Sequence, residues 1–218
     1  MLPVTENTPL QNPFWIYSQN KIACENRLVE AYNREKFPIT IVRPSHTYDQ
    51  TTIPLEGRYT VVARMRKGKQ VIVHGDGSSI WVLTHHQDFA KGFIGLLGNQ
   101  KTVGEAFHIT SDELLTWNQI FDLIAKAAGT EAQKVHIPSE TIAKYNSEWG
   151  AGLLGDKAHS MIFDNSKIKK FVPDFAASIP FSQGIKEIMK WYDEDPARQI
   201  VNESLDKQMD EMIKMFGS

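Results

Sequence analysis

Hydrophobic and polar residues follow a helical period near the N-terminus and then give way to a β-branched run. Residues 14–36 contain no proline or glycine, and apolar side chains from Ile22 to Tyr32 recur at near-helical spacing. Pro38 ends this pattern because proline cannot continue a helix. Ile39–Val42 is a β-branched run closed by Arg-Pro, which is typical of a buried strand in a parallel sheet. The sequence therefore predicts a helix of several turns followed by a strand.

Short apolar runs alternate with amphipathic segments along the rest of the chain. After a loop at residues 45–57, strands are predicted at Val71–Val73, Ala106–Ile109 and Val135–Pro138. Helices are predicted at Arg58–Lys67, Gln87–Leu97, Trp117–Ala128, Ser139–Tyr145, Ser182–Asp193 and Pro196–Phe216. Residues 146–160 are rich in glycine and small residues, which predicts a mobile loop. This alternation indicates an α/β fold, with so few strands that part of a sheet is expected to be absent.

Composition narrows the classes of protein that fit this pattern. The chain has 218 residues with 41% hydrophobic and 23% charged side chains, which suits a globular protein with a real core. Its formal charge of −2 lacks the basic excess of a general nucleic-acid binder. The single cysteine, Cys24, excludes an internal disulfide framework and a Cys-rich zinc site. With no signal peptide or membrane-length apolar run in sight, we expect a cytoplasmic protein without a membrane or metal partner.

Tyr17 and Lys21 are the first candidates for chemistry. They lie four residues apart in the predicted helix, so the phenol and the ammonium share one helix face. A free tyrosine has a pKa near 10, and lowering that pKa by about 3 units requires roughly 4 kcal/mol of preference for the phenolate. The positive charge of a neighbouring ammonium, or of a bound nicotinamide cation, would stabilise the phenolate and so assist such a proton transfer. A tyrosine beside a solvated lysine is the alternative, and spacing alone does not separate the two.

The segment around this pair resembles the active-site helix of a known enzyme family. Residues 9–25, which read Pro-Leu-Gln-Asn-Pro-Phe-Trp-Ile-Tyr-Ser-Gln-Asn-Lys-Ile-Ala-Cys-Glu, are similar to that helix in the extended short-chain dehydrogenases/reductases, the NAD-dependent epimerase/dehydratase family. Four further segments resemble family motifs in the family's order: Ile39–Tyr48, Val71–Asp88, Gly104–Thr110 and Asp164–Tyr192. The resemblance implies a partial Rossmann-type parallel sheet plus a smaller α/β substrate-binding domain.

The resemblance also implies a role for each matching residue. Tyr17 would be the catalytic acid/base and would also border the cofactor. Lys21 would share both roles, binding the nicotinamide ribose and lowering the pKa of the tyrosine. The backbone around Pro44 and Ser45 would border the nicotinamide. His46 would contact the substrate, at a position where many family members have asparagine.

Other residues bear on the substrate and partners. Trp81, the second expected substrate-binding residue, stands where nucleotide-sugar enzymes of the family carry an arginine that binds pyrophosphate, so such a substrate is in doubt. A basic run is interpreted as a solvated helix face, with phosphate contact as the alternative; its members are Arg58, Arg64, Arg66, Lys67 and Lys69. His85 and His86 are adjacent and therefore point apart, so a metal site is not expected. Asp88 is expected to cap the following helix.

The family's cofactor fingerprint, Gly-x-x-Gly-x-x-Gly after a first strand, does not precede Tyr17. Gly92–Gly98 has that spacing but falls in the later half of a predicted helix, so we interpret it as close helix packing. We therefore expect the C-terminal two-thirds of such an enzyme, which binds NAD or NADP when intact but not tightly as this chain alone. Residues 1–50 would be the remainder of the Rossmann domain with the active-site helix. Residues 51–218 would form mainly the substrate-binding domain, with segments at about 70–110 returning to the Rossmann sheet.

The function expected from this resemblance is an NAD(P)-dependent oxidoreductase, epimerase or dehydratase. Its substrate would be a small sugar-like or other hydroxyl or carbonyl compound, and its tyrosine would move the proton. A homodimer through the helix of Tyr17 is expected, because that helix carries more apolar surface than one sheet face needs. The alternative is a non-catalytic degenerate paralogue, or an RNA- or protein-binding module, although a nucleic-acid partner is not expected.

Overall fold

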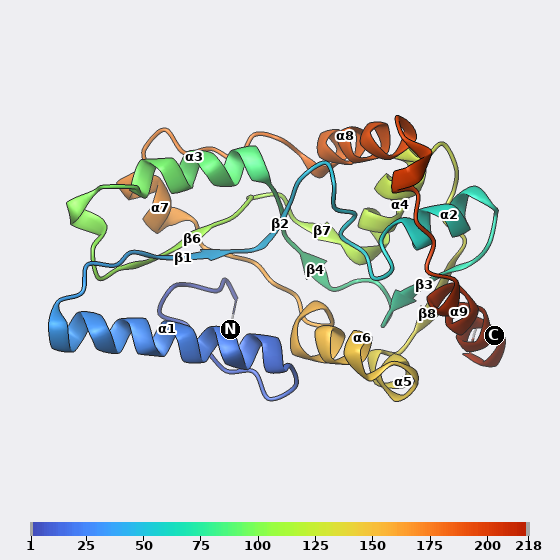
Figure 1. Cartoon of the computed structure of the whole chain (residues 1–218), viewed down its shortest axis with the longest axis horizontal. Coiled ribbons are helices and arrows are strands. Elements are labelled where there is room, and N and C mark those ends of the chain that lie inside the picture. Colours follow the sequence, from blue (N-terminus) through green and yellow to red (C-terminus); the bar gives the residue numbers. More distant parts are fainter. Residues whose placement is uncertain (1, 217–218) are drawn as a thin grey trace.

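The computed structural model describes residues 2–216, which form helices on both sides of short strand pairs (Figure 1). The helices are α1 (Ile16–Glu35), α2 (Tyr59–Arg66), α3 (His86–Leu96), α4 (Trp117–Ala127), α5 (Ser139–Tyr145), α6 (Ser147–Gly152), α7 (Ser166–Phe171), α8 (Phe181–Asp193) and α9 (Glu203–Phe216). Two 3-10 turns, η1 (Gln100–Thr102) and η3 (Pro196–Arg198), and a π-helix, η2 (Leu153–Lys157), complete the helical elements of these residues.

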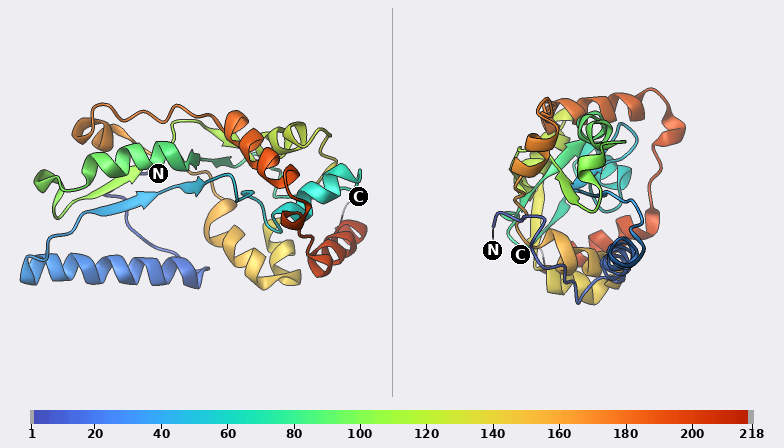
Figure 2. Two further views of the ribbon diagram at one scale, coloured as in Figure 1. Left: turned by 45° about the horizontal axis from the view of Figure 1, so that its top comes forward. Right: turned by 90° about the vertical axis from the view of Figure 1, so that its left-hand side faces the viewer.

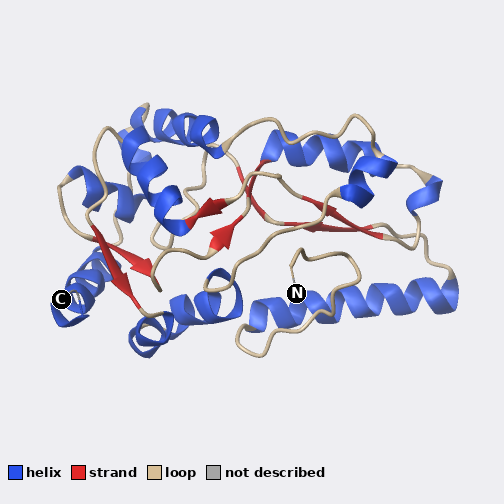
Figure 3. Cartoon of the chain, turned by 180° about the vertical axis from the view of Figure 1, so that it is seen from behind, coloured by secondary structure: helices blue, strands red, loops and turns tan. Residues whose placement is uncertain are grey.

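The strands pair two by two. They are β1 (Ile41–Pro44), β2 (His46–Tyr48), β3 (Val71–His74), β4 (Ile80–Trp81), β5 (Leu83–His85), β6 (Ala106–Ile109), β7 (Leu115–Thr116) and β8 (Lys134–Ile137). Parallel pairs join β1 to β6, β2 to β5 and β3 to β8, whereas β4 and β7 are antiparallel. Figure 3 shows these pairs along the middle of the molecule with helices on either side. The predicted α/β class with parallel sheet pieces is confirmed.

Two hydrophobic cores lie along the molecule. The larger packs α2, α4, α8 and α9 around β3 and β8, with Trp117 and Ile124 of α4 fully buried in it. Thr116 begins α4 with a capping box, as its hydroxyl accepts from the Gln119 amide while the Gln119 side chain accepts from the Thr116 amide. The smaller core lies between β6, α3 and α7 and is built around Phe107 and Ile109. Each core therefore stabilises one end of the molecule.

The glycines of α3 confirm close packing rather than phosphate binding. A Cβ on Gly92 would lie 2.7 Å from Ile109, and a Cβ on Gly95 would clash with Val172. Gly98 has a φ of 74° and follows the last turn of α3, where a left-handed residue ends a helix. The Gly92–Gly98 spacing thus places α3 against β6 and α7.

Helix α1 runs beside the β1–β6 pair on the side opposite α3 (Figure 2, left). None of its residues is buried, and Ile16, Leu28 and Val29 are among its exposed apolar side chains. The helix ends at Glu35 because Lys36 is left-handed, so it stops before the predicted position at Pro38. Helix α1 is consequently held to the sheet by a small number of polar contacts.

Several predictions of local structure were wrong. Residues 146–160 are not an open loop: α6 and η2 occupy most of them, and Trp149 and Leu153 pack into the larger core. Composition misled here because glycine and serine do not prevent a short helix that tertiary packing stabilises. Residues 45–57 contain the strand β2, and Asp88 does not cap α3, since His85 holds that position. The Asp88 carboxylate accepts instead from the Ile179 amide, at 2.8 Å.

The basic run is only partly the solvated face that was predicted: Arg66 and Lys67 are exposed, but three of the five cations form ion pairs. Arg64 is 2% exposed and lies at 2.5 Å from Asp206 and 2.8 Å from Asp210, both on α9. Lys69 pairs with the same two aspartates, and Arg66 pairs with Asp193. These cations are therefore largely neutralised by the C-terminal helices that they hold.

Candidate active site

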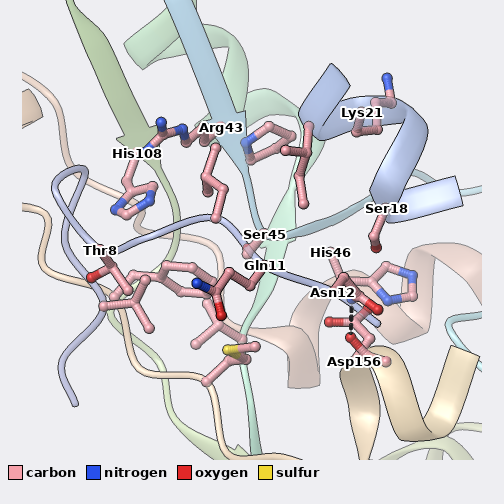
Figure 4. Close-up of a pocket in the computed structure, with 18 of the residues that line it drawn as sticks. Thr8, Gln11, Asn12, Ser18, Lys21, Arg43, Ser45, His46, His108 and Asp156 are labelled. Atoms are coloured by element: carbon pink, nitrogen blue, oxygen red, sulfur yellow. Dashed lines mark hydrogen bonds between the residues drawn. The ribbon is translucent and has the colours of Figure 1, made fainter. Parts of the chain in front are cut away.

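A cavity of about 720 Å³ lies between the N-terminal segment, α1, the ends of β1 and β6, and η2. All six residues expected to form the site line it: Tyr17, Lys21, Pro44, Ser45, His46 and Trp81. Figure 4 shows His46, Asn12 and Asp156 gathered at one end of this cavity, with Arg43 and His108 toward the other. Segments far apart in sequence thus converge on one concave space of the size expected for a small-molecule site.

The Tyr17 phenol and the Lys21 ammonium lie on one face of α1, as predicted. The Lys21 Nζ atom is 5.7 Å from the centroid of the Tyr17 ring, and the Tyr17 side chain is 54% exposed. The Trp15 ring contacts the Tyr17 ring with a centroid separation of 4.8 Å. The tyrosine is therefore open to a ligand in the cavity and has one cation beside it.

An ion pair attaches this face of α1 to the sheet. Arg43 of β1 donates from Nε to the Glu25 carboxylate at 3.1 Å and from Nη2 to its second oxygen. The same guanidinium donates from Nη1 to the Glu6 carbonyl at 2.7 Å, which ties down the N-terminal segment. Charge-assisted bonds of this kind are stronger than neutral ones. Arg43 thus fixes both the helix of Tyr17 and the segment that covers the cavity.

The turn from β1 to β2 contributes Pro44, Ser45 and His46. Ser45 Oγ lies 2.7 Å from Thr84 Oγ1 of β5, so its hydroxyl is held by the neighbouring strand. Burial lowers the pKa of His46 to about 4, with the positive charge of Lys157 adding to the effect. His46 is therefore neutral at pH 7, and its Nδ1 accepts a 3.5 Å hydrogen bond from Trp81 Nε1. This pair forms a rigid, uncharged wall.

Sequence reasoning missed Trp15, Asp156 and Lys157 as cavity residues. Trp15 lies inside the motif that carried the resemblance, but neither spacing nor composition singles it out. Asp156 and Lys157 fall in the segment predicted to be a mobile loop, and only the π-helix brings them to the cavity. Burial raises the pKa of the Asp156 carboxyl. These residues could be found only from the folded chain.

His108 is a further missed residue, placed by β6. Its side chain is buried against the cavity, and Nδ1 has no hydrogen-bond partner among residues 2–216. Burial lowers the pKa of His108, and the positive charge of Arg43 acts in the same direction. Elsewhere, His85 Nε2 lies 3.1 Å from Glu187. Within residues 2–216, no three potential ligands from His, Cys, Asp and Glu gather as a metal site, and no helix has the length and apolar character to cross a membrane.

The cavity fits one end of a dinucleotide cofactor. Lys21 makes no ion pair among the residues that the structure describes, and it lines the same cavity as Tyr17, Pro44 and Ser45, the residues expected to border a nicotinamide riboside. The glycine-rich turn at Gly75 and Gly77 joins β3 to β4 and opens no helix, so it lacks the helix N-terminus that binds a pyrophosphate. Residues 2–216 therefore fit the nicotinamide end only.

Comparison with known proteins identifies the family of this chain. The chain belongs to the NAD dependent epimerase/dehydratase family, whose sequence profile matches residues 2–110. The 2'-dehydrokanamycin reductase of Streptomyces kanamyceticus is 24% identical over 178 residues, which cover 79% of this chain and 49% of that protein. The chloroplast stem-loop binding protein of 41 kDa b of Arabidopsis thaliana is 30% identical over 108 residues, or 49% of this chain and 26% of that protein.

Solved structures share the fold. The crystal structure of dTDP-glucose 4,6-dehydratase from Bacillus anthracis in complex with NAD matches with a TM-score of 0.71 at 21% identity, and the match covers 90% of this chain and 58% of that one. At this identity the likeness establishes a Rossmann-type α/β fold and nothing finer. The chain spans about half the length of the curated relatives it matches.

Proposed function

We propose that this chain carries the acid/base and substrate-binding part of an NAD(P)-dependent oxidoreductase, epimerase or dehydratase. The substrate is a small sugar-like compound with a reacting hydroxyl or carbonyl group, and the protein acts in the cytoplasm. The convergence of three separate segments on one cavity carries this proposal: Tyr17 and Lys21 on α1, residues 44–46 at the end of β1, and Trp81 on β4. Family membership supports the same class of reaction.

Each residue has a physical role in this proposal. The Tyr17 hydroxyl exchanges a proton with the substrate oxygen, and the Lys21 ammonium stabilises the negative charge that develops on the phenol oxygen. Pro44 and Ser45 form the wall beside the nicotinamide, while neutral His46 orients the substrate. The cofactor, when bound, supplies the hydride acceptor or donor.

A second candidate function is RNA binding without catalysis. The similarity to the chloroplast stem-loop binding protein is the observation that favours it. The ion pairs of Arg64, Arg66 and Lys69 weigh against it, since paired cations release fewer counterions from a phosphate backbone. The oxidoreductase proposal is therefore preferred.

The two candidates separate in one screen. The protein, expressed from its natural reading frame, is incubated with NAD or NADP and a panel of sugars, amino sugars and nucleotide sugars while nicotinamide fluorescence is recorded. The proposal expects at least one compound to change the redox state of the cofactor or to be epimerised or dehydrated. Tight, salt-sensitive binding of stem-loop RNA without turnover of any compound would support the second candidate instead.

A further inference from the structure

Lys157 occupies an unusual position in the cavity, between two tryptophan rings. Its Nζ atom lies 5.3 Å from the centroid of the Trp15 ring and 5.9 Å from that of Trp81. Trp15 in turn contacts the Tyr17 ring at 4.8 Å. An ammonium is therefore one indole away from the proposed acid/base. Aromatic faces attract a cation and shield it from water, which strengthens its interaction with an anion.

The backbone of Lys157 is fixed by three side-chain donors. Its carbonyl oxygen accepts from His74 Nε2 at 3.0 Å, Ser79 Oγ at 3.1 Å and Trp117 Nε1 at 3.1 Å. Burial lowers the pKa of His74 to about 4, so the ring is neutral at pH 7 and its proton lies on Nε2. The residue ends the π-helix η2, an irregularity that is frequent at functional sites. These contacts fix the backbone of a residue whose side chain lines the cavity.

The backbone of Trp15, whose indole lies against the Lys157 ammonium, is also fixed by hydrogen bonds. Asn12 donates from Nδ2 to the Gly155 carbonyl of η2 at 2.6 Å, and its Oδ1 accepts from the Trp15 amide at 3.0 Å. A Cβ on Gly155 would lie 2.8 Å from the Trp15 side chain, so glycine permits the approach. The N-terminal segment and η2 are thus joined at the point where the indole meets the ammonium.

The ammonium itself has unused hydrogen-bonding capacity. Within residues 2–216, Lys157 Nζ donates no hydrogen bond, and its closest carboxylate is that of the adjoining Asp156, at 3.7 Å. Glu56 is a second carboxylate that feels this charge, because Lys157 opposes the rise in the Glu56 pKa that burial causes. Neither carboxylate is within hydrogen-bond distance of the ammonium, so its three donors are not satisfied by them.

We propose that Lys157, between Trp15 and Trp81, recognises an anionic group of the substrate, a carboxylate or a phosphate. The substrate is then an acidic sugar-like compound whose anion sits at the indoles while its reacting oxygen faces Tyr17. This assignment rests on the proposed function, because it places both groups in one cavity. It also gives Trp81 a role in binding: the residue is uncharged, but its ring borders the ammonium of Lys157 on η2.

The test uses binding rather than turnover. Indole N–H signals of the ¹⁵N-labelled chain are followed by NMR during titration with sodium D-glucuronate, glucose 1-phosphate or neutral D-glucose. The Trp15 and Trp81 signals are assigned from the Trp15→Phe and Trp81→Phe spectra. We expect at least one anion to shift both signals and glucose at the same concentration to leave them in place. A response to glucuronate alone identifies a carboxylate, and a response to glucose 1-phosphate alone identifies a phosphate.

Three variants make the result specific. Lys157→Gln should weaken anion binding about tenfold or more, because a charged donor is lost, and Lys157→Arg should retain most of it. Lys186→Gln removes the same charge from an exposed position on α8 and should change nothing. The Lys157 variants are expected to fold, since the three structural bonds use its backbone oxygen; unchanged signals of the other tryptophans check this. Glucose binding as tightly as the anions, unaltered anion binding in Lys157→Gln, or no anion response up to tens of millimolar would each overturn the assignment.

Failure of this assignment is separable from failure of the proposed function. In Tyr17→Phe, anion binding should still depend on Lys157, because the Tyr17 hydroxyl makes no hydrogen bond to the ammonium among residues 2–216. Loss of turnover in Tyr17→Phe without any anion preference would leave the proposed function intact and reject the role of Lys157. Anion binding that depends on Lys157 in a protein indifferent to Tyr17→Phe would do the reverse.

Discussion

Glu25→Gln should loosen the helix that carries Tyr17, because α1 buries none of its residues and depends on polar attachment. The Arg43 and Glu25 side chains are only 18% and 16% exposed, and two hydrogen bonds join them. Glutamine keeps the size and one acceptor but removes the negative charge. Arg43 would retain its bond to the Glu6 carbonyl, at 2.7 Å, and lose its only ion-pair partner among the residues described.

The expected magnitude follows from the character of these bonds. Hydrogen bonds to charged groups contribute about 1.5–3 kcal/mol, and this pair is shielded without being fully buried. We therefore expect α1 to lose about 2 kcal/mol of docking free energy, which corresponds to roughly 30-fold faster local opening. The cores around Phe107 and Ile124 should be unaffected, because neither core contains a residue of α1.

Hydrogen exchange measured by mass spectrometry reads this opening directly. Peptides from α1 should exchange faster in Glu25→Gln, while peptides from α4 keep their rates. Glu30→Gln is the matched control on the same helix, since the Glu30–Arg34 pair has side chains that are 53% and 75% exposed. An exposed pair at this spacing contributes about 0.3–0.5 kcal/mol, so the control should change rates about twofold. Equal effects of the two substitutions, or no effect of Glu25→Gln, would refute the attachment described here.

Three further predictions concern cofactor, assembly and pH. Calorimetry of this chain with NAD and NADP should detect weak binding or none, because residues 2–216 fit the nicotinamide end only, and micromolar affinity would contradict this. Light scattering at micromolar concentration should show a dimer or larger species, since α1 exposes Leu28 and Val29, whereas a persistent monomer would count against it. Glu30→Lys should weaken a dimer that uses α1, and insensitivity would point to the open edge of β1. Burial lowers the pKa of His74 from 6.5 to about 4. Between these two pH values the unfolded chain binds a proton at His74 and the folded chain does not. Stability should thus fall with decreasing pH, and His74→Gln should remove about 2 kcal/mol of the loss between about pH 7 and pH 5 in denaturant titrations.

Sequence patterns predicted the features of the fold that depend on neighbouring residues in the chain. The strands at Val71 and Ala106, the helix beginning at Trp117, and the packing glycines Gly92 and Gly95 are all where their sequence patterns place them. The six expected site residues line one cavity because order along a shared motif carries spatial information. Their roles stay predictions until activity is measured.

The features that the sequence did not predict depend on contacts between residues far apart in the chain. The basic run reads as solvent-facing until Asp206 and Asp210, more than a hundred residues later, are brought beside Arg64. Lys157 belongs to a segment that composition marks as irregular, yet its conformation is set by His74 and Trp117 from two other elements. No window of sequence contains either set of contacts.

The central claim is that Tyr17 moves the proton, and Tyr17→Phe compared with Tyr32→Phe tests it most directly. Both substitutions remove one phenol oxygen from α1, but Tyr32 contacts Gly104 outside the cavity. The measurement uses the protein expressed from its natural reading frame and records the rate of cofactor reduction or product formation with the compound that the screen identifies. The account predicts that Tyr17→Phe abolishes turnover while Tyr32→Phe retains it, with cofactor binding largely intact in both. A Tyr17→Phe variant that keeps most of its activity would show that the tyrosine and lysine are incidental neighbours on a helix.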